Sequence, residues 1–433
     1  MKNEALQMAR GVRDFGPEEK IARDKIVTTL KQVFESFGYN PIETPVLERY
    51  ELFASKFGIG QESDAMRETF KLKDQGNRDI VLRTEFTVPF SRFVGMNPQF
   101  KKPFKRYQIG QVFRDGPIKL GRYREFWQCD VDVVGIGSPQ IDAEIIQLTV
   151  EAFAKLGMEI EFRLNNRKIL NEILKYAGIT GEQQISAIIA IDKLDKIGVD
   201  GVKEELKEKQ IAGSAVDTIL KLISIEGNNQ GKIVQLRDVL SEVAGLDEVE
   251  QALAFVIDNQ NVFFVPSLAR GLAYYTGNVF EVYLKDSSKI SSSICAGGRY
   301  DDMIGGFLGT NEVYPAVGIS FGLETIFDAI KLNQNNDDVV KSVTDVYLLA
   351  LDDKYVKKIM NIAKQLRQAG IKADMDYLGR KLKKNLEYAD SYGVSWVIML
   401  GESEEVENKL MLRNMKTGEQ EKLSVDQIIE KLR

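Results

Sequence analysis

The clearest alternation of polar and apolar positions lies between Val112 and Gly135, where two extended segments flank a short basic loop. Successive side chains of a strand point to opposite faces, so a period of two separates the second segment into two sets. One set is Arg122, Arg124, Phe126, Gln128, Asp130 and Asp132, and the other is Tyr123, Glu125, Trp127, Cys129, Val131 and Val133. Arg114 ends the preceding strand on the polar side. Because a core would not accept such a polar row unpaired, the pattern favours a cleft for a zwitterion and a phosphate. The alternative is a solvated strand with surface ion pairs.

The residues before this pattern are predicted to form one helix and several strands. Residues Pro17 to Phe37 carry an apolar stripe at helical spacing, with proline in the first position and Gly38 at the exit. Strand character then dominates from Asn40 to Gly135. Within it, an extended segment from Val81 to Thr87 would place Arg83, Glu85 and Thr87 on one face.

A change in the spacing of the apolar positions, from strand-like to helical, marks further domains. Helical segments separated by glycine-containing breaks occupy about 166–247, for example Arg167 to Tyr176 and Val216 to Ile223. Strand character returns from Val262 to Leu284 and again from Ser291. A polar linker then precedes an alternation of buried strands (VYLLAL, IKADMDY, SWVIMLG) and helices at 354–369, 382–392 and 425–432, with two short strands before the last helix. This alternation predicts a three-layer α/β domain with a mixed sheet.

The composition limits the chemistry that is available. The 433 residues suffice for two or three domains, and 44% hydrophobic with 28% charged residues is ordinary for a soluble protein. No apolar run has the length of a membrane span, no signal-peptide core is visible, and there are two cysteines, so we expect a cytoplasmic protein. The chain has no histidine, which excludes Ser-His-Asp catalysis and makes a zinc site improbable. Catalysis would then use arginines, carboxylates and metal ions.

The net charge of −6 argues against a generally basic surface, although local patches decide contacts with phosphates. Two candidate patches are Lys101, Lys102, Lys105 and Arg106, and Arg380, Lys381, Lys383 and Lys384. The second is favoured because it lies in a segment with its own domain pattern. Each could equally be a solvated face.

Several segments resemble the motifs of the histidyl branch of class II aminoacyl-tRNA synthetases. Motif 2 corresponds to the Val112–Gly135 pattern, motif 1 to GYNPIETPVLE (Gly38 to Glu48), and motif 3 to AVGISFGLET (Ala316 to Thr325). Two further signatures are SLARGLAYYTGNVFE (Ser267 to Glu281) and AGGRYDDMIGGF (Ala296 to Phe307). RKLKKNLEYADSYG is similar to the anticodon-binding domain of several class II enzymes. Together these segments cover nearly the whole chain.

The resemblance implies an α+β fold. A catalytic domain with the antiparallel sheet of class II synthetases would comprise residues 1–165 and 248–331, interrupted by a helical insertion domain at 166–247. A linker at 332–345 would lead to an α/β anticodon-binding domain at 346–433. The implied reaction is the activation of L-histidine by ATP, with Mg²⁺, and its transfer to the 3′ end of tRNA-His. A homodimer formed through motif 1 is also implied.

The resemblance also implies site residues. Arg114 and Arg270 would be catalytic, because guanidinium groups neutralise charge that develops on the α-phosphate. ATP would contact Arg114, Arg122, Gly318 and Gly322. Histidine would contact Glu85, Thr87, Gln128, Asp132, Arg270, Tyr274, Tyr275, Gly297 and Gly298, with Asp132 and Tyr275 supplying one partner for each imidazole nitrogen. No metal site made by the protein alone is implied.

Three residues depart from the family pattern. Ala273 stands where an acidic residue is usual, Gly116 where motif 2 has a glutamate, and Thr325 where motif 3 ends in an arginine. Glu324 and Lys119 could replace part of the lost charge. The alternative functions are therefore a catalytically weak paralogue that acts as a histidine- or tRNA-sensing regulatory subunit, and a ligase for another amino acid. The retained arginines and the last domain favour an active enzyme, and the Asp132–Tyr275 pair favours histidine.

Overall fold

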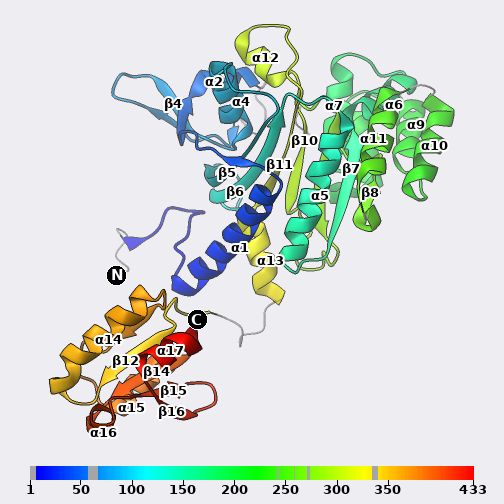
Figure 1. Cartoon of the computed structure of the whole chain (residues 1–433). Coiled ribbons are helices and arrows are strands. Elements are labelled where there is room, and N and C mark those ends of the chain that lie inside the picture. Colours follow the sequence, from blue (N-terminus) through cyan, green and yellow to red (C-terminus); the bar gives the residue numbers. More distant parts are fainter. Residues whose placement is uncertain (1–5, 57–66, 241–242, 258, 271–273, 334–339) are drawn as a thin grey trace. The chain divides into compact units, whose positions relative to one another are not determined.

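The computed structural model describes residues 6–56, 67–240, 243–257, 259–270, 274–333 and 340–433 (Figure 1). The chain forms two compact units, one of residues 1–13 and 26–333 and the other of residues 14–25 and 334–433. Ala273 and residues 334–339 of the predicted linker lie outside the described residues. No helix in the described parts is both long enough and apolar enough to cross a membrane.

The first unit is built on an eight-stranded sheet in the order β1-β5-β6-β11-β10-β9-β7-β8. In that order the strands are Asn40–Pro41, Phe104–Phe113, Glu125–Val134, Ala316–Gly322, Cys295–Arg299, Asn278–Leu284, Ile160–Asn166 and Val262–Phe264. The pairs β1/β5 and β7/β8 are parallel, and the five other pairs are antiparallel. A mainly antiparallel sheet is therefore the platform of this unit.

Strand β6 shows the predicted separation of its two faces. Cys129 and Val131 are buried on one face, where Phe321 of β11 and Tyr107 of β5 are their partners in register. Both of these rings pack on Phe34 of α1 (Pro17–Ser36), with centroids 5.4 and 5.8 Å away. The strand begins only at Glu125, so the prediction that Arg122 and Arg124 belong to it is wrong. These two residues lie in the preceding turn.

A smaller sheet in the order β2-β4-β3 (Leu47–Arg49, Asp79–Leu82, Lys71–Lys73) lies with α2 (Tyr50–Lys56) in the same unit. The predicted strand from Val81 to Thr87 is wrong, because β4 stops at Leu82 and helix α4 (Thr87–Met96) begins at Thr87. The carboxylate of Glu85 accepts the N–H groups of Thr87 (3.0 Å) and Val88 (2.9 Å), which stabilises the start of the helix. Arg83 instead donates to the carbonyl oxygens of residues 44 and 111.

Helices pack around the edge of the eight-stranded sheet that is formed by β7 and β8. Helix α5 (Pro139–Lys155) packs against α11 and the sheet, and α6–α11 form a cluster beyond β7 and β8 (Figure 1). These helices are α6 Arg167–Tyr176, α7 Glu182–Ile191, α8 Leu194–Glu208, α9 Gly213–Ile223, α10 Asn229–Leu240 and α11 Ala244–Phe255, and a 3₁₀ turn, η2, spans Asn259–Asn261. The prediction of helix from Arg167 to Tyr176 is confirmed. Ile169, Leu170, Ile173 and Leu174 form its buried stripe. Helices α12 (Met303–Leu308) and α13 (Leu323–Asn333) follow β10 and β11.

The second unit contains a five-stranded mixed sheet in the order β13-β12-β14-β15-β16. The strands are Ala373–Met375, Val346–Ala350, Trp396–Leu400, Leu410–Asn414 and Gln420–Leu423, of which the first three are parallel. Leu348 of β12 packs on one face with α14 (Val356–Gln368) and α17 (Val425–Leu432), and Leu349 on the other with α15 (Leu382–Ser391). The predicted three-layer domain is therefore confirmed. The 3₁₀ turn η4 (Asp353–Tyr355) and the short helix α16 (Glu402–Val406) were not predicted.

The second predicted basic patch lies in this unit. Lys381, Lys383 and Lys384 are exposed at the start of α15. Arg380 is held differently, since its guanidinium lies 3.4 Å from Asp376 Oδ1 and 4.5 Å from the ring centre of Tyr388. The three lysines are thus the part of this patch that is available to a partner.

Candidate active site

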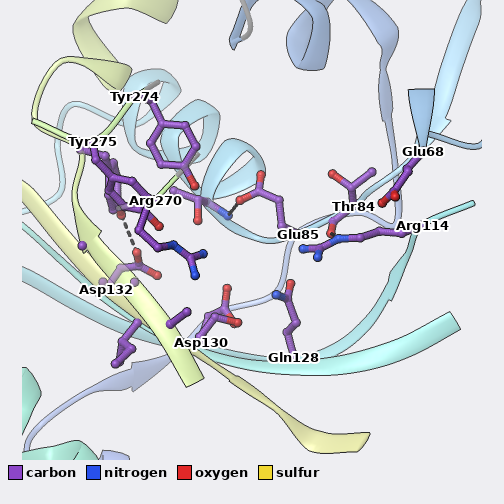
Figure 2. A pocket seen from close by; sticks show the side chains of 18 of the residues that line it. Glu68, Thr84, Glu85, Arg114, Gln128, Asp130, Asp132, Arg270, Tyr274 and Tyr275 are labelled. Atoms are coloured by element: carbon purple, nitrogen blue, oxygen red, sulfur yellow. Dashed lines mark hydrogen bonds between the residues drawn. The ribbon is translucent and has the colours of Figure 1, made fainter. Parts of the chain in front are cut away.

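A cavity of about 600 Å³ opens over the polar face of the eight-stranded sheet (Figure 2). This volume is in the range of small-molecule sites. The cavity wall includes every predicted site residue except Gly322: Glu85, Thr87, Arg114, Arg122, Gln128, Asp132, Arg270, Tyr274, Tyr275, Gly297, Gly298 and Gly318. Residues more than 200 positions apart in the chain therefore meet in one place.

Asp132 is held at the base of the cavity by two buried partners. Tyr300 donates its hydroxyl to Oδ1 at 2.5 Å, and Nη2 of Arg106 lies 2.5 Å from Oδ2. Arg106 is the residue directly opposite Asp132 in the β5–β6 register and is completely buried. Burial raises the pKa of Asp132, while the charge of Arg106 opposes this rise. A carboxylate has about four lone-pair positions, so Asp132 can accept a further donor from a ligand.

The prediction of a basic surface patch at Lys101, Lys102, Lys105 and Arg106 is therefore wrong. Arg106 is an internal counter-charge, and Nζ of Lys105 pairs with Glu144 at 2.6 Å and donates to the carbonyl of Phe37. Only Lys101 and Lys102 of that patch are exposed. A patch that was predicted from the chain order alone is divided between the interior and the surface because neighbouring strand residues face opposite sides.

Glycines form the floor of the cavity beside Asp132. In the sheet, Asp132 of β6 lies opposite Gly318 of β11, which lies opposite Gly298 of β10. A Cβ atom on Gly318 would lie 2.0 Å from Oδ1 of Asp132, and one on Gly298 would lie 2.8 Å from the ring of Tyr275. Asp132 thus leans over Gly318 from one side, and Tyr275 covers Gly298 on the other. Neighbouring strands are about 4.8 Å apart, so the two side chains lie over adjacent strands of the same floor.

Tyr275 is suited to hydrogen bonding as a neutral phenol. Burial raises its pKa, so the hydroxyl proton is retained at neutral pH. The rings of Tyr274 and Tyr275 are 4.6 Å apart and form one wall of the cavity. The carboxylate of Asp132 and the phenol of Tyr275 therefore offer one charged acceptor and one neutral hydroxyl.

Two further polar groups face the cavity, Glu85 from the segment before α4 and Gln128 from β6. The carboxylate of Glu85 is oriented by the first N–H groups of α4, which leaves it further acceptor capacity on the cavity side. Oε1 of Gln128 is buried and accepts no hydrogen bond from the described residues. Buried polar atoms normally have a partner, so this oxygen is available to a ligand donor. A ligand ammonium group could donate to both residues.

Arg114 and Arg270 face the same space from opposite sides of Glu85 (Figure 2). Nε of Arg114 donates to the carbonyl of Thr84 at 3.0 Å, and burial lowers the pKa of its guanidinium. Burial also acts to lower the pKa of Arg270, but the charge of Glu281, with Oε1 2.5 Å from Nη1, contributes to a net rise. Both side chains are anchored on one edge and can bind an anion with their remaining N–H groups.

Arg122 reaches the cavity from the turn before β6. Lys119 and Arg122 exchange backbone hydrogen bonds of 3.1 and 2.8 Å, and Nη2 of Arg122 lies 2.6 Å from Oε1 of Glu68. Arg124, in contrast, pairs with Asp115 at 3.0 Å and is not among the lining residues, and neither is Phe126. The predicted polar face thus contributes Arg122, Gln128, Asp130 and Asp132 to the cavity.

Thr325, its two suggested substitutes and Gly322 all lie outside the cavity wall. Thr325 Oγ1 donates to the carbonyl of Gly121 at 3.3 Å. Glu324 is buried and accepts the N–H of Trp127 at 2.7 Å, and Lys119 is exposed. Neither of these two candidate substitutes lines the cavity. Gly322 pairs with Gln128 in register and donates its N–H to the carbonyl of Ile294, also outside the cavity wall.

Sequence reasoning missed part of the wall. The additional lining residues are Arg67, Glu68, Thr84, Pro117, Asp130, Ala296, Tyr300, Ile319 and Ser320. Asp130 was placed on the polar face but received no role, although its position two residues before Asp132 was a signal. No local pattern marks Glu68. The described residues contain no cluster of three or more acidic or cysteine side chains placed to hold a metal ion.

Asp130 makes the stability of the fold depend on pH. Burial raises the pKa of Asp130 to about 8; Arg106 opposes this rise, and Asp132 and Glu85 add to it. An unfolded aspartate titrates near pH 3.9, so the folded state holds an extra proton from about pH 4 to 8 and loses stability as the pH rises through this range. Asp130→Asn should therefore stabilise the protein by about 1–3 kcal/mol more at pH 8 than at pH 5. Urea unfolding at both pH values measures this difference, and an equal effect at both would contradict the assignment.

Known families and relatives match nearly the whole chain. Residues 11–326 match the family described as "Histidyl-tRNA synthetase", and residues 345–433 match the family described as "Anticodon binding domain". Histidine–tRNA ligase 1 of Bacillus thuringiensis subsp. konkukian is 41% identical over 430 residues, which cover 98% of this chain and 99% of that protein.

Solved structures give the same result for the fold. The crystal structure of histidyl-tRNA synthetase from Nostoc sp. PCC 7120 matches with a TM-score of 0.86 and 30% identity, covering 99% of this chain and 98% of that one. A structure from Bacillus halodurans C, described as an ATP phosphoribosyltransferase regulatory subunit/histidyl-tRNA synthetase, matches with a TM-score of 0.74 at 22% identity, covering 91% and 98%. At that identity the likeness concerns the fold alone. The fold is that of class II synthetases with a C-terminal anticodon-binding domain, and the chain belongs to the histidyl-tRNA synthetase family.

Proposed function

We propose that this chain is a histidine–tRNA ligase, which activates L-histidine with ATP and transfers it to the 3′ end of tRNA-His. The observation that carries the proposal is the placement of Asp132 and Tyr275 on either side of a glycine floor, in the same cavity as Arg114 and Arg270. The first pair suits an imidazole, and the second suits a phosphoryl centre.

The amino acid would bind with its ring between Asp132 and Tyr275. A neutral imidazole has one N–H donor and one acceptor nitrogen, which match the carboxylate and the phenol respectively. The α-ammonium group would lie between Glu85 and Oε1 of Gln128, supported by Thr87. The carboxylate would then point toward Arg114 and Arg270, and Gly297 and Gly298 would admit the ligand close to the backbone.

In the activation step, a carboxylate oxygen of histidine forms a bond to the α-phosphorus of ATP, and the bond from that phosphorus to pyrophosphate breaks. Negative charge on the phosphoryl oxygens is neutralised by guanidinium groups that are already oriented. Arg114, held by Thr84, and Arg270, held by Glu281, would supply this charge, and Arg122 would contact the adenosine end. The adenylate would then react with the terminal ribose of the tRNA.

ATP and Mg²⁺ fit the residues that are present. Mg²⁺ usually keeps several waters and is bound through one or two carboxylates together with substrate phosphates, so it can enter with the nucleotide without a protein cage. Two wall carboxylates are engaged by other groups, Glu68 by Arg122 and Glu85 by the α-ammonium group, so the ion would be held mainly by the phosphates of ATP. When bound, the ion would neutralise charge on the phosphates.

The regulatory paralogue that the sequence left open is less well supported. A histidine sensor needs only the Asp132–Tyr275 side of the cavity, whereas this chain also directs Arg114, Arg122 and Arg270 into it. Charging of a tRNA-His transcript with labelled histidine, ATP and Mg²⁺ tests the proposal. Histidyl-tRNA formation is expected, and histidine binding without charging would favour the sensor instead.

We propose that α6–α11 form the insertion domain, that the second unit binds the anticodon arm, and that the enzyme is a cytoplasmic homodimer. The exposed lysines Lys381, Lys383 and Lys384 would contact the RNA backbone, since phosphate contacts come mainly from such side chains.

Reversing these three charges to glutamate should raise the KM for tRNA about tenfold or more, because each lost phosphate contact weakens binding and its salt dependence. ATP–pyrophosphate exchange, which needs no tRNA, should stay unchanged. The matched control is the reversal of Lys357, Lys409 and Lys416 in the same unit. If the tRNA KM stays the same in the first variant, this face is not the RNA contact.

A further inference from the structure

Position 116 shows how the chain compensates for one departure from motif 2. The family pattern implies a glutamate there, two residues after Arg114, and this chain has a glycine. In the structure, the space that a side chain at 116 would need is filled. A Cβ atom on Gly116 would lie 2.7 Å from Cδ and Oε1 of Glu68 and 2.9 Å from Oε2. A carboxylate is therefore present at this point, but it comes from a residue 48 positions earlier in the chain.

Glu68 is attached to the motif 2 loop by its backbone and its side chain. The N–H of Asp115, next to Gly116, donates to the carbonyl of Glu68 at 2.7 Å. Oε1 of Glu68 accepts from Nη2 of Arg122 at 2.6 Å. The side chain of Glu68 is 20% exposed and that of Arg122 is 46% exposed. The less exposed carboxylate thus holds the more exposed guanidinium at the edge of the cavity.

The arrangement depends on glycine at 116. Contacts below 3.0 Å from a Cβ atom are essentially absent in proteins, so any larger residue at 116 would displace the Glu68 carboxylate. Conversely, with glycine at 116 and no acid at 68, Arg122 would lose its anionic partner at this edge of the cavity. Gly116 and Glu68 therefore act as a complementary pair.

We propose that Glu68 is the positioning residue that replaces the missing motif 2 glutamate and orients Arg122 for the adenosine and phosphate end of ATP. This inference rests on the proposed function, because it assigns Arg122 to ATP. Glu68 acts through Arg122 and not on the reacting atoms, so its loss should affect nucleotide binding more than the chemical step. Histidine binding should be unaffected, because Asp132 and Tyr275 are held by other residues.

The test moves the carboxylate side chain from position 68 to position 116. Glu68→Ala should weaken binding of Mg²⁺ with a non-hydrolysable ATP analogue about tenfold, with less than twofold change in histidine affinity, both measured by isothermal titration. Gly116→Glu alone should also weaken nucleotide binding, because two carboxylates compete for one space. The double variant Glu68→Ala/Gly116→Glu should recover to within about threefold of the wild type.

The matched control is Asp79→Ala, which removes an exposed carboxylate paired with Lys73 at 2.9 Å, outside the cavity wall. It should leave nucleotide affinity unchanged. Unchanged affinity in Glu68→Ala, or a double variant no better than Gly116→Glu, would overturn the inference. Because the readout is binding, it is separate from the proposed reaction: a wild type that binds the analogue but fails to charge tRNA would contradict the function and leave the positioning result valid.

Discussion

Arg270→Ala should lower the kcat of histidine-dependent ATP–pyrophosphate exchange by about 10²–10³-fold, the usual cost of removing one preorganised donor to a developing negative charge. Arg270 is anchored by Glu281 at 2.5 Å and faces Arg114 across the cavity (Figure 2). Its remaining N–H groups would bind the phosphoryl oxygens most strongly in the transition state. The loss should therefore appear in kcat, while histidine binding remains measurable by titration.

The control for this experiment is another arginine with carboxylate partners. Arg237 pairs with Asp247 at 2.6 Å and Glu250 at 3.1 Å in the helical region, away from the cavity wall. Arg237→Ala should leave exchange unchanged, and thermal melts of both variants would check the fold. Wild-type turnover in Arg270→Ala would remove this residue from the mechanism.

Gly318→Ala should weaken histidine binding by about 10–100-fold, which is the effect of losing one hydrogen bond to a charged group. The added methyl group would lie 2.0 Å from Oδ1 of Asp132 and 2.8 Å from the carbonyl of Val131. Because the carbonyl belongs to the paired strand, the backbone cannot move away cheaply. The Asp132 carboxylate must turn, and it then loses its position opposite Tyr275.

Gly213→Ala is the matched control, since a Cβ atom there has no neighbour within 4 Å. It lies at the start of α9, where alanine is a better helix former than glycine. This variant should bind histidine like the wild type. If Gly318→Ala also binds histidine normally, by isothermal titration, the glycine floor beside Asp132 is not the ring site.

Much of the site could be predicted because strand geometry is local. The period of two in β6 was enough to place Gln128, Asp130 and Asp132 on one face and their apolar neighbours on the other. The alternation of strands and helices in the second unit was equally clear, since β12 and β14 carry continuous apolar runs between helices of simple amphipathic pattern.

Other features depend on partners that are distant in the chain. Arg106 looked like part of a basic surface, because its counter-charge at Asp132 is 26 residues away and meets it only across the β5–β6 register. Glu68 gave no signal, because its relation to Gly116 exists only in space. The start of helix α4 was mistaken for a strand. The first N–H group of the helix, at Thr87, is bound by Glu85, which precedes the helix, and Pro89 is tolerated because it lies in the first turn.

The central claim is that one cavity combines an imidazole site with a phosphoryl site. Its most direct test is ATP–pyrophosphate exchange by the wild-type protein with Mg²⁺ and each of the standard amino acids in turn. The account predicts exchange with histidine and with no other amino acid, because a site that pairs both ring nitrogens rejects side chains lacking them by about 10⁴–10⁵-fold. Exchange that depends on a different amino acid, or no exchange with histidine, would contradict it.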